Sequence, residues 1–296
     1  MPDLSDSSPE SAAPTPGTGS WPPLPERLPV DVPDSHCHLD IAFDESKHGP
    51  GLTVERALDL AGSVGVTRVV QVGYDVASSR FGVETAHRHP QVVAAVALHP
   101  NEAPRLVADG TFEEAFATIA ALAGDARVRA VGETGLDHFR TGEDGRAAQE
   151  ESFRRHIDLA KRLDRTLVIH DRDAHDDVVS VLLSEGAPDR VVFHCFSGGP
   201  DLARRCAEHG WFMSFAGTIT FKANEHLREA LVTAPLELVL VETDAPFLAP
   251  LPHRGRPNAS YLVPVTLHTM AAVKEVDLAA LGAVVAANTD RAFGPW

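Results

Sequence analysis

The sequence predicts an α/β fold, a single-domain (β/α)8 barrel, on three observations. Eight short runs rich in Val, Ile and other apolar residues recur along the chain. Longer stretches in which apolar residues have helical spacing connect these runs, and this alternation is typical of a parallel sheet. The glycine-rich GxGxxG turn of an open, doubly wound sheet does not follow the first run. Eight βα units therefore favour a closed barrel.

The predicted strands are apolar runs of strand length, and they span residues 32–38, 66–73, 92–99, 128–133, 166–170, 191–196, 211–215 and 238–243. The predicted helices have apolar residues three and four positions apart over helix-length stretches. They include residues 54–64, 80–88, 147–163 and 201–209. Residues 261–296 are expected to add one or two further helices on the exterior of the barrel.

Residues 1–31 differ from the rest of the chain in composition. They are rich in Pro, Ser, Gly and Ala and have hardly any periodicity, so we expect a disordered or loosely attached arm. Residues 32–296 then form the barrel domain, without an internal repeat or a second domain. A chain of 296 residues is long enough for one large α/β domain of this kind.

Composition narrows the classes of function. No apolar run is long enough to span a bilayer, and the N-terminus lacks the basic and apolar regions of a signal peptide. Three cysteines without a CxxC motif suit a reducing compartment, so we expect a cytoplasmic protein. A net charge of -16 counts against broad nucleic-acid binding. Any recognition of phosphate must therefore be local.

Histidines and carboxylates stand at the ends of the predicted strands. His36 and His38 end the first strand, and the alternation of side chains places both on one face, with Cys37 on the other. Four further ligand-type side chains end later strands, namely Glu133, His170, His194 and Asp244. Because the carboxyl ends of barrel strands meet at one end of the molecule, we expect these six side chains to surround one centre.

Four imidazoles and two carboxylates are more ligands than one catalytic metal ion takes. The set predicts two divalent metal ions, with Glu133 as the bridging carboxylate. Asp244 is expected to coordinate one ion and to take the proton from a water that the two ions activate. Magnesium, manganese, zinc and nickel all accept a mixed set of imidazole and carboxylate ligands, so the identity of the metal stays open.

Five motifs, in this order and spacing, resemble the successive signatures of the TatD family of metal-dependent hydrolases and deoxyribonucleases, within the amidohydrolase superfamily. They are Ser35-His36-Cys37-His38-Leu39-Asp40, Gly132-Glu133-Thr134-Gly135-Leu136-Asp137, His170-Asp171-Arg172-Asp173-Ala174, His194-Cys195-Phe196-Ser197-Gly198 and Glu242-Thr243-Asp244-Ala245-Pro246-Phe247-Leu248. The resemblance covers the chain from about residue 32 to the C-terminus.

This resemblance implies a TIM-type barrel and a binuclear divalent-metal site with the same six ligands. It also implies phosphodiester hydrolysis of DNA, frequently by a magnesium-dependent exonuclease, although members of the family differ in substrate and preferred metal. Two features depart from the family's pattern. His138 stands where an aromatic residue is more usual, and residues 258–260 read Asn-Ala-Ser where Asn-Glu-Pro is common. These departures concern substrate contacts and remove no ligand.

Two arginines and two acids are candidates for supporting roles. Arg254 lies in the loop after the eighth strand, a recurrent phosphate site in this architecture, where its guanidinium group can clamp a phosphate. Arg172 follows His170 and is a second candidate for substrate binding. Glu242 and Asp137 are expected to orient the metal ligands by hydrogen bonding, although for Asp137 a structural hydrogen bond explains the residue equally well.

Three functions remain open at this stage. The first is a metal-dependent nuclease that acts on DNA ends or single strands. The second is a small-molecule hydrolase of amide, lactone or phosphoester bonds, as elsewhere in the superfamily. The third is a metal-binding barrel without turnover. The loop around Arg254 favours a phosphate substrate, whereas the net charge disfavours a long duplex. The sequence indicates no obligate protein partner and no membrane association.

Overall fold

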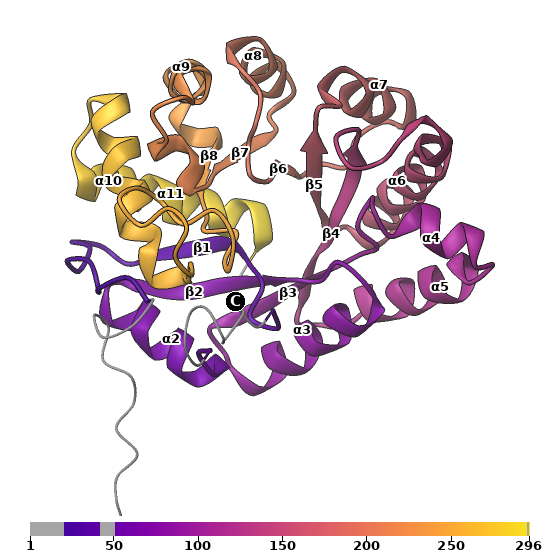
Figure 1. The fold of residues 1–296 in the computed structure, drawn as a ribbon, viewed down its shortest axis with the longest axis horizontal. Helices are drawn as coiled ribbons and strands as arrows, with labels where there is room; N and C mark the ends of the chain where they lie inside the picture. The colour runs from indigo at the N-terminus through magenta and orange to yellow at the C-terminus, as the bar shows by residue number, and fades with distance from the viewer. Residues whose placement is uncertain (1–20, 42–50, 295) are drawn as a thin grey trace, which may run out of the picture.

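The computed structural model describes residues 21–41, 51–294 and 296 of the chain. Eight parallel strands follow one another in sequence order and curve into a nearly closed barrel, with helices on its outside (Figure 1). The predicted fold class is confirmed. The strands are β1 (Val32–Cys37), β2 (Val66–Val72), β3 (Val92–Val96), β4 (Val128–Asp137), β5 (Thr166–Arg172), β6 (Val191–Phe193), β7 (Phe212–Phe215) and β8 (Val239–Val241).

The strands are apolar because both of their faces are covered. Every residue of β1, β3, β6, β7 and β8 is buried. A parallel sheet with helices on one face and a packed interior on the other leaves no strand face in water. The strands are therefore continuously apolar in sequence, instead of alternating between polar and apolar residues.

The helices cover the outer face of the sheet. They are α2 (Val54–Ser63), α3 (Val76–Arg88), α4 (Ala103–Ala108), α5 (Phe112–Ala123), α6 (Glu143–Leu163), α7 (His175–Glu185), α8 (Pro200–His209), α9 (Glu225–Thr233), α10 (Val263–Lys274) and α11 (Leu278–Phe293). Local capping sets several of their starts. Thr53 accepts a hydrogen bond from the Arg56 amide before α2, and Asp75 accepts one from the Ser78 amide before α3. The one or two further helices expected within residues 261–296 are α10 and α11.

Several elements end elsewhere than predicted. The third strand ends at Val96 rather than at residue 99, whereas β4 continues past residue 133 to Asp137. The longer β4 has a partner along its last residues, because Thr134 to Asp137 pair with Ile169 to Arg172 of β5. Pairing with a neighbouring strand thus determines where a strand ends. The hydrophobic pattern of a single segment carries no information about that pairing.

The seam between β1 and β8 closes the barrel at the end that carries the predicted ligands. The Asp244 amide donates to the His36 carbonyl at 3.0 Å, and the His38 amide donates to the Ala245 carbonyl at 2.7 Å. The fully buried Asp34 carboxylate accepts from the Thr243 amide at 2.9 Å and from the Thr243 hydroxyl at 2.6 Å. The first and last strands are therefore joined beside the ligands.

The last residues of the predicted arm lie against the barrel. Residues 21–31 form no helix or strand, but Leu28 is buried and its amide donates to the Val64 carbonyl at 3.0 Å. The Tyr261 hydroxyl donates to the Pro22 carbonyl at 2.8 Å. Attachment to the barrel thus begins before the expected boundary at residue 31, because a few apolar side chains in this Pro-rich segment find buried positions. Residues 1–20 lie outside the described residues.

Within the described part of the chain, none of the helices has the length and apolar character needed to cross a membrane.

Candidate metal centre

The six predicted ligands lie at the carboxyl ends of their strands and come together in one buried cluster. His36 lies in β1 and His38 directly after it, and Glu133 and His170 lie in β4 and β5. His194 follows β6 directly, and Asp244 lies three residues after the end of β8. All six are buried or nearly so, and the Asp244 side chain, at 14% exposure, is among the more accessible. The barrel architecture thus brings together side chains that are up to 208 positions apart, from residue 36 to residue 244.

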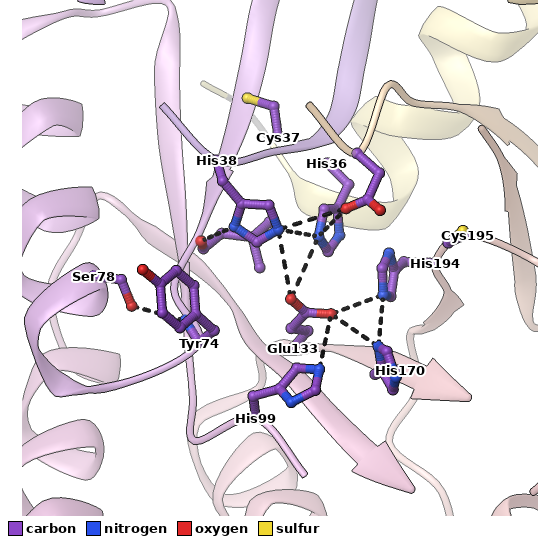
Figure 2. A network of polar contacts seen from close by, with 12 residues as sticks. His36, Cys37, His38, Tyr74, Ser78, His99, Glu133, His170, His194 and Cys195 are labelled. Carbon is purple, nitrogen blue, oxygen red and sulfur yellow. Dashed lines mark hydrogen bonds and ion pairs between the residues drawn. The ribbon is translucent and has the colours of Figure 1, made fainter. Parts of the chain in front are cut away.

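Glu133 occupies the middle of the cluster, and ring nitrogens of His36, His38, His99, His170 and His194 lie within 4.0 Å of its carboxylate oxygens (Figure 2). Its Oε1 atom lies 3.5 Å from His38 Nε2 and 3.9 Å from His36 Nε2. Its Oε2 atom lies 2.8 Å from His194 Nε2 and 3.3 Å from His170 Nδ1. The two carboxylate oxygens therefore face two different pairs of histidines, as a bridging carboxylate must.

Asp244 faces the first of these pairs. Its Oδ1 atom lies 3.7 Å from His36 Nε2 and 3.5 Å from His38 Nε2. Its backbone has a positive φ of 54°, in a left-handed conformation that L-residues adopt rarely and that is concentrated at functional sites. The hydrogen bond from its amide to His36 fixes the position of this turn relative to β1.

Close packing of β4 on β5 depends on Gly135. Its φ is 140°, and a Cβ atom built there would lie 2.1 Å from the carbonyl oxygen of His170. Any side chain would push the two strands apart. Gly135 therefore allows β4 and β5 to approach so closely that Glu133 and His170 lie within reach of each other.

Polar contacts behind the histidines determine which ring nitrogen faces the cluster. His38 Nδ1 lies 2.9 Å from the Val72 carbonyl and donates to it, so the lone pair of the neutral ring is on Nε2. His194 Nδ1 lies 3.4 Å from Glu242 Oε1, and His170 Nε2 lies 3.3 Å from Asp137 Oδ2. The two acids predicted to orient ligands thus contact the far nitrogens of His194 and His170.

Each of these acids is itself held in place. The Cys195 amide donates to Glu242 Oε1 at 2.7 Å. Asp137 accepts from the Arg140 amide at 2.8 Å and from Asn101 Nδ2 at 3.0 Å. Burial opposes ionisation of Asp137, but hydrogen bonds, that of His170 foremost, hold its pKa below the usual range.

The electrostatics of the cluster keep Glu133 ionised. Burial alone would raise the pKa of this carboxyl group, but the adjacent His194 and His99 hold it well below its usual value. Burial and the neighbouring His194 lower the pKa of His36 well below its usual value, so that ring is neutral. A neutral imidazole beside a carboxylate is a donor set for a divalent cation of borderline softness.

A further histidine, His99, belongs to the cluster, and our sequence reasoning did not identify it. His99 Nε2 lies 4.0 Å from Glu133 Oε2, and its ring meets that of His170 edge-on at 4.4 Å between centroids. Burial, then the nearby His170, lowers its pKa to about 3. The available signal was its position at the end of the third predicted strand, the same position that identified the other histidines.

Three sets of ligand atoms within this cluster are compact enough to hold a metal ion, with all atoms of a set within 4.8 Å of one another. They are His36, His38 and Glu133; His36, His194 and Asp244; and His99, Glu133 and His170. Together they contain all six predicted ligands and His99. The donor set of the described residues therefore fits divalent metal ions.

The two arginines predicted to bind substrate lie on phenylalanine rings. The Arg254 guanidinium carbon is 4.8 Å from the centroid of Phe221, and that of Arg172 is 3.9 Å from the centroid of Phe139. In the part of the chain that the structure describes, no hydrogen bond or ion pair joins either arginine to the histidine cluster. Their role in substrate binding stays a prediction.

Fold and site together are those of a metal-dependent hydrolase built on a parallel barrel of eight strands. A family model described as TatD related DNase matches residues 33–294. The chain therefore belongs to the TatD family.

Relatives of known sequence carry the same class description. The "uncharacterized metal-dependent hydrolase TatD" of Mycobacterium tuberculosis is 42% identical over 265 residues, which covers 88% of this chain and 97% of that protein. The "uncharacterized metal-dependent hydrolase YcfH" of Escherichia coli is 34% identical over 263 residues, or 88% of this chain and 94% of that protein. This chain is thus similar along almost its whole barrel to proteins described as metal-dependent hydrolases.

Solved structures agree with this assignment. The crystal structure of YJJV, a TatD homologue from Escherichia coli, superposes with a TM-score of 0.76 at 25% identity and covers 90% of this chain and 98% of that one. A phosphotriesterase homology protein from Escherichia coli, complexed with phosphate in its active site, gives a TM-score of 0.61 at 15% identity, covering 90% of this chain and 99% of that one. The second likeness concerns the fold alone.

Proposed function

We propose that this protein hydrolyses phosphodiester bonds of DNA, at ends or in single strands, with two divalent metal ions. The observation that carries the proposal is the position of Glu133, whose two oxygens face two separate pairs of histidines. A carboxylate in this position supports a two-ion site, and two-ion sites are common among enzymes that cleave phosphodiesters. The family description as TatD related DNase supports the same substrate class.

The chain's own residues divide between the two ions. His36 and His38, which both face Asp244, would hold one ion together with that carboxylate, and His170 and His194, which face Glu133 Oε2, would hold the other. Glu133 would be shared, and His99 lies beside the second group. Bound divalent ions would supply a water of lowered pKa and would neutralise charge on the attacked and leaving oxygens. Magnesium, manganese, zinc and nickel are all candidates for this set.

Asp244 is the residue we assign to proton transfer. Its carboxylate faces the cluster, is partly accessible, and lies 3.5 Å from His38 Nε2. A carboxylate in this position can accept the proton of the attacking water while the backbone hydrogen bond to His36 holds it in place. Glu133 keeps its negative charge and its central position. Arg254 and Arg172 remain candidates for contact with the substrate phosphates.

The net charge favours a second candidate, a hydrolase of small amides, lactones or phosphoesters. With a net charge of -16, the chain would repel a long polyanion, and only local positive charge can offset this repulsion. The same acidity is compatible with DNA if the substrate is a strand end, which brings few phosphates to the protein.

The test uses oligonucleotides labelled at the 5′ or the 3′ end, incubated with the full chain and magnesium, manganese, zinc or nickel. We expect shortening of a single strand with at least one metal. Asp244→Ala should lower the rate by about 100-fold or more, as loss of a general base does, whereas Asp158→Ala, an exposed acid on α6, should not. Cleavage of an amide or lactone together with intact diesters under every metal would contradict the proposal.

A further inference from the structure

A cavity of about 400 Å³ lies beside the metal centre, and His38 is part of both. Its walls come from the segment after β1, the start of α2, α3, the loop after β8 and the N-terminal segment. Apart from His38, none of its described lining residues belongs to the histidine cluster. A volume of this size is typical of pockets that hold small organic ligands.

The walls of the cavity are mainly apolar and include two aromatic side chains. Trp21 and Phe81 line it together with Leu39, Leu52, Ala57 and Pro246. Flat apolar walls favour a ring system or a sugar face, because both can bury their surface there without losing hydrogen bonds. The apolar part of the walls offers a phosphate group no hydrogen-bond donor.

The cavity also contains a carboxylate in a fixed position. Asp40 lines it, and Gln71 Nε2 donates to Asp40 Oδ1 at 2.8 Å. Gln71 is fully buried in β2, and its Oε1 atom accepts from the Leu39 amide at 2.6 Å. The buried glutamine therefore fixes both the backbone and the side chain of the segment that follows His38. A fixed carboxylate accepts hydrogen bonds from hydroxyl or N–H groups and repels anions.

We propose that this cavity binds the terminal nucleoside of the DNA strand and that Asp40 recognises its free hydroxyl group. The inference rests on the proposed function, because the adjacent His38 then belongs to the centre that binds the first phosphodiester. A nucleoside offers what the cavity requires, a flat base for the apolar walls and a hydroxyl donor for Asp40. A terminal phosphate would place roughly two negative charges beside this carboxylate.

The first experiment compares strand ends. Single-stranded oligonucleotides that carry either a hydroxyl or a phosphate at the 5′ or the 3′ end are digested by the full chain with its preferred metal. At the end from which the enzyme degrades, we expect hydroxyl ends to be cleaved about tenfold faster or more, the ratio that one charge-assisted hydrogen bond provides. Asp40→Asn should reduce this ratio to below about threefold. Asp59→Asn on α2, an exposed position with the same change of charge, should keep the ratio of the wild type.

The second experiment fills the cavity. Ala57→Phe places a ring in it from α2, and Ala77→Phe adds the same ring at an exposed position of α3. For each variant, kcat/KM is measured for the oligonucleotide and for methyl p-nitrophenyl phosphate, a diester without a nucleoside whose single ring is the leaving group. We expect the ratio of the two values to fall about tenfold or more for Ala57→Phe, through KM, and to stay that of the wild type for Ala77→Phe.

The outcomes separate the two proposals. If no diester is hydrolysed under any metal, both the proposed function and the nucleoside site are wrong. If diesters are hydrolysed but hydroxyl and phosphate ends are cleaved equally, the nucleoside site alone is wrong. Equal oligonucleotide-to-diester ratios for Ala57→Phe and Ala77→Phe would contradict it as well. Should Ala57→Phe fail to fold, the Asp40→Asn comparison still decides.

Discussion

Glu242 shows how a single residue can act on the metal centre without belonging to it. It is fully buried, and its Oε1 atom faces His194 Nδ1 at 3.4 Å and accepts from the Cys195 amide at 2.7 Å. These contacts hold the His194 ring with Nε2 toward Glu133. A partner of this kind fixes the tautomer of a ligating histidine and makes it more basic.

Replacement of Glu242 should therefore weaken metal binding. For Glu242→Gln we expect the affinity for divalent metal to fall by about 10- to 100-fold, measured by titration of metal-free protein with manganese or zinc. Glu237→Gln, at an exposed position just before β8, is the matched control. An unchanged affinity in Glu242→Gln would show that His194 does not need this contact to hold a metal ion.

His156 lies outside the centre and is a second informative residue. It is fully buried in α6, where Nε2 accepts from the Leu98 amide at 3.1 Å and Nδ1 donates to the Ser152 carbonyl at 2.7 Å. Burial lowers its pKa from 6.5 to about 4. The folded protein thus keeps the ring neutral, while the unfolded chain takes up a proton near pH 6.5.

This difference makes stability depend on pH. The contribution of His156 is complete above pH 6.5 and is lost as the pH falls toward 4, by about 3 kcal/mol in the free energy of unfolding. We expect denaturant unfolding in EDTA to show a shallower loss of stability between these pH values in His156→Gln than in the wild type. Parallel pH profiles for the two proteins would be incompatible with a buried neutral histidine.

At the scale of elements, the seam between β1 and β8 connects the fold to the site. Asp34 in β1 accepts hydrogen bonds from the backbone and the side chain of Thr243, which precedes Asp244. Asn258 Nδ2 donates to the Thr243 and Phe247 carbonyls at 2.9 and 2.6 Å, and so holds the loop after β8 from the other side. Ligands from the first and last strands keep their relative positions through these contacts.

Removal of the Asp34 carboxylate should destabilise this seam. Asp34→Ala leaves the buried Thr243 amide and hydroxyl without an acceptor, and we expect a loss on the order of 2–3 kcal/mol in the free energy of unfolding. Chemical denaturation of metal-free protein measures this loss directly. Asp158→Ala, at an exposed position, should lose well under half as much. Equal stability of the two variants would mean that Asp34 does not hold the seam.

The positions of most elements could be predicted from the sequence, and their ends could not. Apolar runs mark strands because each strand is buried on both sides. The ends depend on partners elsewhere in the chain, as in β4, which continues to Asp137 because β5 pairs with it. The start of α3 at Val76 follows from the Asp75 cap, a local signal that the hydrophobic periodicity alone did not reveal.

The candidate site was predictable to a similar extent. Six ligand-type residues were identifiable because a barrel fold puts the carboxyl ends of all its strands at one end of the molecule. In the structure these six residues lie together there. His99 obeys the same rule, because it ends the third predicted strand. In the structure it lies three residues beyond the end of β3, just as Asp244 lies three residues beyond the end of β8. The position of Arg254 depends on a loop conformation, which no periodic pattern encodes. Arg172 is the last residue of β5, two residues beyond the predicted end of that strand at residue 170.

For the whole molecule, the net charge and the fold both favour a substrate that brings few phosphates to the protein. The net charge of -16 disfavours long contacts with a polyanion, and the buried cluster at one end of the barrel offers a single small region for phosphate. A two-ion centre supplies positive charge at that point alone. Recognition of a strand end is consistent with both properties.

The number of metal ions per chain tests this account most directly. Elemental analysis of the full chain, after equilibration with excess divalent metal and removal of free ions, should give about two ions per chain, the number expected of a bridged hydrolytic centre. A value below one ion per chain under these conditions would contradict the two-ion centre and the mechanism built on Glu133.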